Sequence, residues 1–427
     1  METTSLLHDP AFWLLVLFAI PLILRVPIAL ALGFSALVVV WQWDLGFSML
    51  SYNFFAGIAK FPLLAIPFFI LAGYIMERSG IAARIVALME ALVGSMTGGL
   101  ALATVAVATF WGAVSGSGPA TVAALGLILI PGMAKAGYDK AFAAATVSVT
   151  SGLAIVIPPS IAFIVYGSVA DVSVPALFAA GFVPGIVVAL FIMAAVLIIS
   201  RKRGYRGQPS GKSVGTALKE AFWGVMTPVV ILGGIYGGIM TPTEAAAVAA
   251  FYGLIVGVFL YREMDFKTVC SSCVASCETS SIIIVLMAMA TLFGNIMTIE
   301  DVPGTIARWM LSITESKIII LLLINVLLLI VGVFMEALAA IVILTPILLP
   351  VVTGVGVSPL HFGIIMVVNL AIGFLTPPVG VNLFVASGVA QAKIEKIAVA
   401  VLPMIALMLI VLAIITYCPS VPLMLVH

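Results

Sequence analysis

Two proline pairs inside long apolar stretches decide how this chain folds: Ile157-Pro158-Pro159-Ser160 and Leu375-Thr376-Pro377-Pro378-Val379-Gly380-Val381-Asn382. Consecutive prolines remove two backbone donors and keep the preceding residue out of the helical region, so each pair must break its helix. Pro158 and Pro377 have the same separation along the chain as Pro131 and Pro350. We therefore predict a duplicated unit of roughly 200 residues. The alternative is chance similarity between apolar segments.

The composition places these breaks in a membrane. Of the 427 residues, 64% are apolar and 8% are charged, whereas about a quarter of the residues in a soluble domain are charged. Apolar runs of about 20 residues, enough to cross a bilayer, recur along the chain. The net charge of +1 excludes the strongly basic faces that bind nucleic acid. We predict an all-α integral membrane protein that contacts the lipid bilayer and no nucleic acid.

A basic loop at 201–220 divides the chain. It holds six of the 18 Lys and Arg residues, and the positive-inside rule places it in the cytoplasm. The first predicted repeat comprises scaffold helices, an amphipathic arm, a hairpin and a broken helix: 1–200, with the hairpin at 98–134 and the broken helix at 139–171. The second has the same parts and a last helix: 221–427, with the hairpin at 317–354 and the broken helix at 359–391.

The hairpins are predicted to be re-entrant. Only the eleven residues Ala120–Ile130 separate the SGSGP break from Pro131, a length of about 16 Å or half a bilayer. A helix that kinks at Pro131 and continues is the alternative. The arms Ile81–Ser95 and Val302–Ser316 carry scattered charges, among them Glu315, and are typical of amphipathic helices at the interface.

Interrupted helices at matching places in two repeats are typical of secondary transporters, whose sites lie where broken helices meet. We expect the repeats to be inverted. Signatures of enzymes are absent: the three histidines are isolated, and there is no HExxH and no GxxxxGK[ST]. The chain is therefore not predicted to be an enzyme, and without a nucleotide-binding loop an ion gradient is the simplest energy source.

Two segments stand out as places for a cation. Ser115-Gly116-Ser117-Gly118-Pro119 combines flexible glycines with hydroxyls, and neutral oxygens of this kind suit a hard cation. Glu336 lies in an apolar stretch, where a carboxylate normally marks an ion or solute pathway. Ser117 is its counterpart in the first half, at the same offset as the proline pairs. A tight turn, for the first segment, and a helix cap, for Glu336, are the structural alternatives.

The helix breaks themselves supply further polar groups. Carbonyls freed at membrane depth are tolerated where they are buried or line a wet cavity. Ser160, Thr376 and Asn382 could bind ion or solute there, and Asn369 is expected to face the same cavity. A plain kink is the alternative.

Two other motifs favour structural roles. Thr241-Pro242-Thr243-Glu244 has the spacing of a helix-capping box. Cys270, Cys273 and Cys277 share one helical face. A metal site there is conceivable, but a small-residue packing face explains the spacing equally well.

At these same places the sequence resembles the large membrane subunit, the M or DctM type, of the tripartite ATP-independent periplasmic (TRAP) transporters. The matching words span most of the chain: IPFFILAG at 66–73, SGSGPAT at 115–121, IPPSI at 157–161, YGGIMTPTEAAAV at 236–248, FME at 334–336 and VVNLAIGFLTPPVGVNLFVASG at 367–388. The resemblance implies an elevator-type transporter in the bacterial inner membrane that imports an organic acid, such as a C4-dicarboxylate or sialic acid, together with Na⁺. It implies two partners, a small four-helix membrane subunit (Q type) and a periplasmic substrate-binding protein (P type).

The resemblance also suggests residue roles. Ser115, Gly116, Ser117, Gly118 and Pro119 would form a first Na⁺ site, and Glu336, Thr376, Pro377, Pro378 and Gly380 a second. Ser115, Ser160, Glu336, Asn369 and Asn382 would surround the carboxylate solute. The alternative function is a stand-alone ion-coupled anion permease or cation antiporter.

Overall fold

The computed structural model describes residues 9–207, 209–314 and 316–426. Every regular element in these ranges is helical, which confirms the prediction of an all-α chain. Nine of the described helices are long and apolar enough to cross a membrane. Glu315 and the last residue of the chain, together with the first eight, lie outside the described residues.

The first half begins with the helices that precede its hairpin. They are α2 (Pro10–Ile23), α3 (Ile28–Gln42), α4 (Phe47–Ile58), η1 (Phe61–Leu64), α5 (Ala65–Arg78) and α6 (Ile81–Val93). A hairpin, an interrupted helix and a long helix follow: α7 (Gly99–Ser115), α8 (Gly118–Lys135), α9 (Lys140–Ser151), η2 (Gly152–Ile155), α10 (Ile161–Ala170) and α11 (Val174–Arg203).

The second half repeats this order. Its surrounding helices are α12 (Val214–Tyr236), α13 (Pro242–Ile255), η3 (Val256–Leu260), α14 (Phe266–Ile299) and α15 (Val302–Ile313). The hairpin, interrupted helix and last helix are α16 (Lys317–Phe334), α17 (Ala337–Gly354), α18 (Pro359–Gly373), α19 (Val381–Ala390) and α20 (Ile394–Tyr417).

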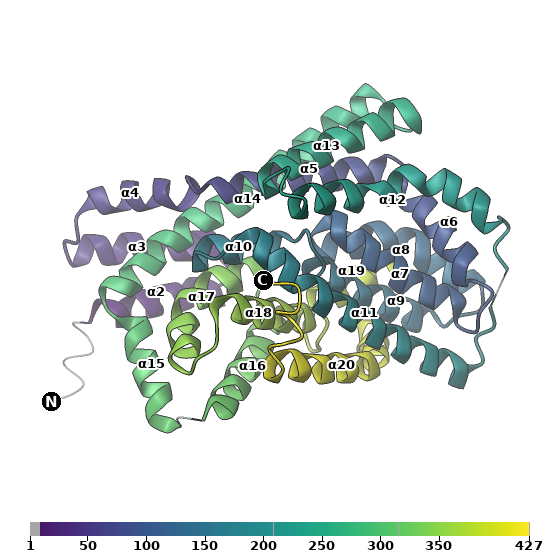
Figure 1. Ribbon diagram of the computed structural model, residues 1–427. Helices are drawn as coiled ribbons and strands as arrows, with labels where there is room; N and C mark the ends of the chain where they lie inside the picture. The colour runs from purple at the N-terminus through teal and green to yellow at the C-terminus, as the bar shows by residue number, and fades with distance from the viewer. Residues whose placement is uncertain (1–8, 208, 315, 427) are drawn as a thin grey trace.

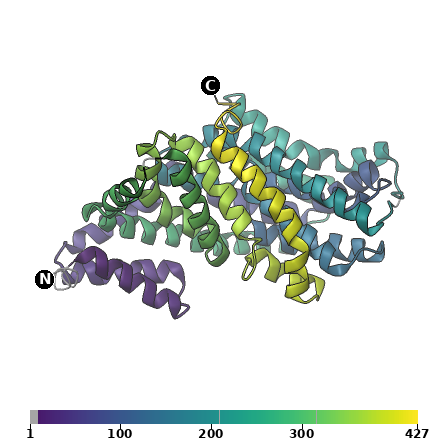
Figure 2. The same cartoon turned by 90° about the horizontal axis from the view of Figure 1, so that it is seen from below.

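Helix bounds in the two halves correspond at the spacing seen in the sequence. Both ends of α8 and α17 are offset by the same amount as the two proline pairs, and so are the first residues of α9 and α18. The halves also interlock, because α8 packs against α19 of the second half while α17 packs against α10 of the first. Figure 2 shows the N-terminal helices at one end of the molecule, α11 and α12 toward the other, and α20 running between them.

The expectation that the second arm of each hairpin stops at its proline is wrong. α8 passes through Pro131, and α17 passes through Pro346 and Pro350, so each helix has 18 residues. At 1.5 Å per residue each is about 27 Å long. A proline inside a helix removes one backbone hydrogen bond, but neighbouring helices hold the chain in place, and α8 packs along both α9 and α19.

The helices do break at the two proline pairs. α10 resumes at Ile161 after Ile157-Pro158-Pro159-Ser160, and α19 resumes at Val381 after the second pair. Both Pro-Pro bonds are cis. Figure 1 shows α10, α17 and α18 near the middle of the molecule, with α2–α4 toward one side and α7–α9, α11 and α19 toward the other, while α5, α12 and α13 lie along the top.

Candidate functional site

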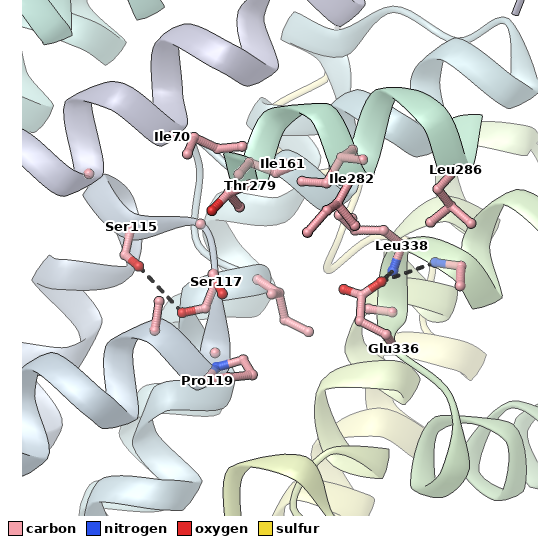
Figure 3. Close-up of a pocket in the computed structure, with 18 of the residues that line it drawn as sticks. Ile70, Ser115, Ser117, Pro119, Ile161, Thr279, Ile282, Leu286, Glu336 and Leu338 are labelled. Atoms are coloured by element: carbon pink, nitrogen blue, oxygen red, sulfur yellow. Dashed lines mark hydrogen bonds between the residues drawn. The ribbon is translucent and has the colours of Figure 1, made fainter. Parts of the chain in front are cut away.

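A cavity of about 400 Å³ lies between the tips of the two hairpins. Its walls are residues 115–120 from the first tip, residues 336–339 from the second, and the facing sides of α3, α5 and α14. Figure 3 shows Ser117 and Glu336 on opposite sides of this space, with Thr279 and Ile282 of α14 beside it. Two tips from opposite halves of the sequence therefore meet at one cavity.

The first tip is a tight turn between α7 and α8. Gly116 ends α7 with a positive φ of 62°, a conformation open to glycine at little cost. The Ser117 carbonyl accepts hydrogen bonds from the hydroxyls of Ser115 (3.3 Å) and Thr121 (2.8 Å), and from the Thr121 amide (3.1 Å). Because three donors already use this carbonyl, the Ser117 hydroxyl is the better free ligand at the tip.

The second tip is closed by Glu336. Its carboxylate caps α17, accepting the amides of Leu338 at 3.0 Å and Ala339 at 3.2 Å through the same oxygen, Oε2. The helix-cap alternative is therefore real, but it does not exclude a second role. The side chain is exposed to the cavity that it lines, and among the described residues no salt bridge neutralises it.

The charged side chains that line the cavity are all acidic. Among the described residues, its lining includes the carboxylates of Glu336 and of Glu77 on α5, and no Lys or Arg. The remaining polar groups are the hydroxyls of Ser115, Ser117, Tyr74 and Thr279, and the rest of the wall is mainly apolar. Such a cavity attracts cations and repels a lone anion.

A second cluster of oxygens lies behind the first tip. The fully buried Asn382 side chain contacts Gly118, where an added Cβ would stand 3.1 Å from both its Nδ2 and its Oδ1. Its Nδ2 donates to the Ser148 carbonyl at 3.4 Å. Asn382 Oδ1 and Ser148 Oγ are both buried without a hydrogen-bond partner, and the Ser151 carbonyl lies 3.4 Å from the same Cβ position. Unpaired buried oxygens are rare in proteins, so this cluster fits a cation held by hard ligands.

Sequence reasoning missed Ser148 and Ser151. The available signal was the run Thr146–Ser151, in which four of six residues carry hydroxyls inside an apolar segment. All six are buried. The constant offset pairs equivalent positions of the two halves. It could not reveal this contact, because Asn382 and Ser148 belong to opposite halves and are not equivalent positions.

Other predicted site residues lie away from the cavity. Asn369 is buried between α16, α18 and α20, where its Nδ2 donates to Asn325 at 2.6 Å. It is not among the residues that line the central cavity. Its Oδ1 has no partner among the described residues. Ser160 is also buried, and it donates to the Ile155 carbonyl at 2.6 Å, which closes the first break internally.

The residues predicted for the second Na⁺ site are only partly brought together. The Thr376 hydroxyl donates to the Ile372 carbonyl at 2.8 Å. Phe374 lines the cavity with Glu336, but Thr376, Pro377, Pro378 and Gly380 are not among the lining residues. In the described part of the chain, no hydrogen bond joins Glu336 to this second break.

The two structural motifs have different outcomes. Thr241 and Glu244 form a complete capping box at the start of α13, as predicted. Cys270, Cys273 and Cys277 are all exposed, so the packing explanation for their spacing is wrong. Serines of the same helix, Ser272, Ser276 and Ser280, are the buried small residues instead. No group of three potential metal ligands from His, Cys, Asp and Glu exists within the described ranges.

Comparison with known proteins shows the family to which this chain belongs. The family model described as the DctM component of the tripartite ATP-independent periplasmic transporter matches residues 14–421. The chain belongs to this TRAP transporter family. The family is one of transporter permeases, so the chain is a membrane transport component and not an enzyme.

Individual relatives carry different solute names. The isethionate TRAP transporter permease DctMQ of Oleidesulfovibrio alaskensis is 55% identical over 97% of this chain, which spans 66% of that longer relative. The C4-dicarboxylate large permease DctM of Vibrio cholerae is 41% identical over 93% of both chains. The solved YdaH transporter of Alcanivorax borkumensis shares the fold, with a TM-score of 0.66 and 16% identity over 87% of each chain.

Proposed function

We propose that this TRAP permease imports a small organic anion, a carboxylate or a sulfonate, together with Na⁺ across the bacterial inner membrane. A small Q-type membrane subunit and a P-type periplasmic binding protein would complete the system, in keeping with the tripartite family to which the chain belongs. The relatives named for isethionate and for C4-dicarboxylates support an anionic solute of a few carbons.

The observation that carries the proposal is the cavity between the hairpin tips and its charge. In the described part of the chain, two carboxylates and no Lys or Arg side chain line it. A like charge about 4 Å from a carboxylate costs about 4 kcal/mol at an effective dielectric constant of 20. An organic anion therefore needs compensating cations to occupy this space, which favours cation coupling over uniport of the anion.

The residues present fit a bound Na⁺ in one place. Asn382 Oδ1 and Ser148 Oγ, both buried and unpaired, would hold it with the Ser151 carbonyl next to Gly118. The ion would supply positive charge to the core and tie the first hairpin tip to the second half of the chain. Glu336 would add a carboxylate at the opposite tip, where its Oε1 makes no bond to the α17 amides.

We further propose that the halves are inverted repeats and that transport is of the elevator type. The matching helix bounds support the duplication, and the crossed packing of α8 on α19 and of α17 on α10 makes one interlocked core. The cavity lies where this core meets α3, α5 and α14. Sliding of the core along that wall would carry the cavity across the membrane.

Uptake into proteoliposomes tests the proposal. Vesicles would contain this chain and the small subunit, and labelled isethionate or succinate would be offered with or without the binding protein and an inward Na⁺ gradient. We expect uptake only when every component and the gradient are present. Uptake without the binding protein would favour a stand-alone permease, and uptake without Na⁺ would contradict cation coupling.

A further inference from the structure

A second cavity, of about 500 Å³, lies away from the hairpin tips, between the end of α11 and the first turns of α20. The start of α9 completes it, and α20 packs against both α9 and α11. α11 ends in three consecutive basic residues and leads into the basic loop at 201–220, which the positive-inside rule places in the cytoplasm. This cavity, called here the α11–α20 groove, therefore lies at the cytoplasmic surface of the membrane.

The charged side chains that line the α11–α20 groove balance one another. They are Asp139, Arg203, Glu395 and Lys396. Arg203 Nη1 lies 4.0 Å from Asp139 Oδ1, and this oxygen already accepts the Phe142 amide at 3.0 Å. In the described part of the chain, neither Glu395 nor Lys396 forms an ion pair with another residue. Two cations and two carboxylates thus face the groove, and one charge of each sign has no protein partner.

The groove becomes apolar on its membrane side. Ile199 lies one turn before Arg203 on α11, while Val399 and Pro403 lie one and two turns after Glu395 on α20. Because α11 runs toward the cytoplasm and α20 starts beside its end, these apolar residues lie deeper in the membrane than the charges. Val399 is 68% exposed, so this wall is open to the lipid. Charges at the interface above an apolar wall match the polarity of a phospholipid and not of a soluble ion.

The balance of charge also distinguishes between headgroups. Arg203 and Lys396 suit a phosphate, but the two carboxylates would repel a lipid whose headgroup is only anionic. Phosphatidylethanolamine carries a phosphate and a primary ammonium group, and such an ammonium has three N–H donors for carboxylates. Phosphatidylcholine has the same charges, but its quaternary nitrogen has no N–H to donate. The groove therefore matches phosphatidylethanolamine best.

We propose that the α11–α20 groove binds a phosphatidylethanolamine molecule of the cytoplasmic leaflet. Arg203 and Lys396 hold its phosphate, Glu395 accepts its ammonium group, and an acyl chain follows the apolar wall. Because α11 belongs to the first half of the chain and α20 to the second, the bound lipid ties the two halves together. The inference depends neither on the identity of the transported solute nor on Na⁺ coupling.

The test is thermal unfolding of the purified, delipidated full-length chain in detergent micelles that contain increasing mole fractions of one phospholipid. Phosphatidylethanolamine should stabilise the wild-type protein at a lower mole fraction than phosphatidylcholine or phosphatidylglycerol, and water-soluble glycerophosphoethanolamine should not stabilise it. Lys396→Gln should raise the half-saturating mole fraction of phosphatidylethanolamine about fivefold, the factor expected for one basic residue at a headgroup. Glu395→Gln should remove the preference for phosphatidylethanolamine over phosphatidylcholine.

Lys202→Gln is the matched control, because Lys202 lies next to Arg203 at the end of α11 but is not among the residues that line the groove. It should respond to each lipid as the wild type does. Lys202, Glu395 and Lys396 are all exposed, so these variants should unfold at the wild-type temperature without added lipid. The inference is overturned if phosphatidylcholine, phosphatidylglycerol or glycerophosphoethanolamine stabilises the wild type as well as phosphatidylethanolamine does. It is also overturned if Lys396→Gln or Glu395→Gln matches the wild type, or if Lys202→Gln reproduces their loss.

Discussion

Replacing Glu336 by glutamine separates its capping role from its charge. The wild-type carboxylate accepts two α17 amides through Oε2, at 3.0 and 3.2 Å. A glutamine oxygen can accept the same two bonds, so the cap remains. Only the interaction between a negative charge and the helix N-terminus is lost, which is worth about 0.3–1 kcal/mol. The variant should therefore fold and assemble normally.

The loss for transport should be larger. A cation about 4 Å from the carboxylate gains about 4 kcal/mol at an effective dielectric constant of 20. Glu336 is exposed to the cavity, so water reduces this figure, and we take roughly half of it, about 2 kcal/mol. Since each 1.4 kcal/mol is a factor of ten, the Na⁺ concentration for half-maximal uptake should rise more than about tenfold.

The assay is labelled-solute uptake at a series of Na⁺ concentrations, with thermal unfolding of the same preparation as the control for folding. Glu336→Ala provides the comparison, because it removes both the cap and the charge and should cost about 0.5–2 kcal/mol in stability. Glu336→Gln with an unchanged Na⁺ half-saturation would refute the cation role and leave Glu336 as a cap.

Three further results are expected. Asn382→Ala should abolish the extra stabilisation that Na⁺ gives over K⁺ in thermal unfolding, because it deletes a buried oxygen proposed as a Na⁺ ligand. It should also lower stability in K⁺ buffer, since the hydrogen bond to the Ser148 carbonyl is lost. Equal Na⁺ stabilisation in both proteins would exclude this ligand. Gly373→Ala should destabilise the protein by about 1–3 kcal/mol, because the added Cβ would lie 2.6 Å from the Gly332 backbone. Gly388→Ala is the control and should not destabilise it, because the space around Gly388 is open. Similar melting curves for the two variants would contradict the close contact between Gly373 and Gly332. Thr241→Ala should cost about 1 kcal/mol through loss of the capping box, and Thr241→Ser should restore most of it, as measured by thermal unfolding with uptake unchanged.

The sequence was sufficient for the helix breaks and for their order. Proline pairs cannot be accommodated in a regular helix whatever surrounds them, so a local covalent property decided the breaks at Pro158 and Pro377. The capping box at Thr241 was equally local, because its four groups lie within one turn. The constant offset between the halves likewise anticipated where α17 and α18 begin.

Single prolines were not decisive in the same way. Pro131 lies inside α8, and the helix continues because its neighbours compensate for one missing hydrogen bond. A length computed from sequence to the next proline was therefore too short. The prediction that the cysteines of α14 form a packing face was wrong for a related reason. Helical periodicity shows which residues share a face, but not whether that face packs against other helices or lies on the surface.

What the sequence by itself determined was the membrane class, the interrupted helices and the two polar hairpin tips. Each of these depends on composition or on residues adjacent in the chain. Only the tertiary structure decided that Ser117 and Glu336 face one cavity, that Asn382 contacts Gly118 of the other half, and that Asn369 turns away to Asn325. These are contacts between residues far apart in the chain, and they are set by which helix faces pack together, a property that no local pattern contains.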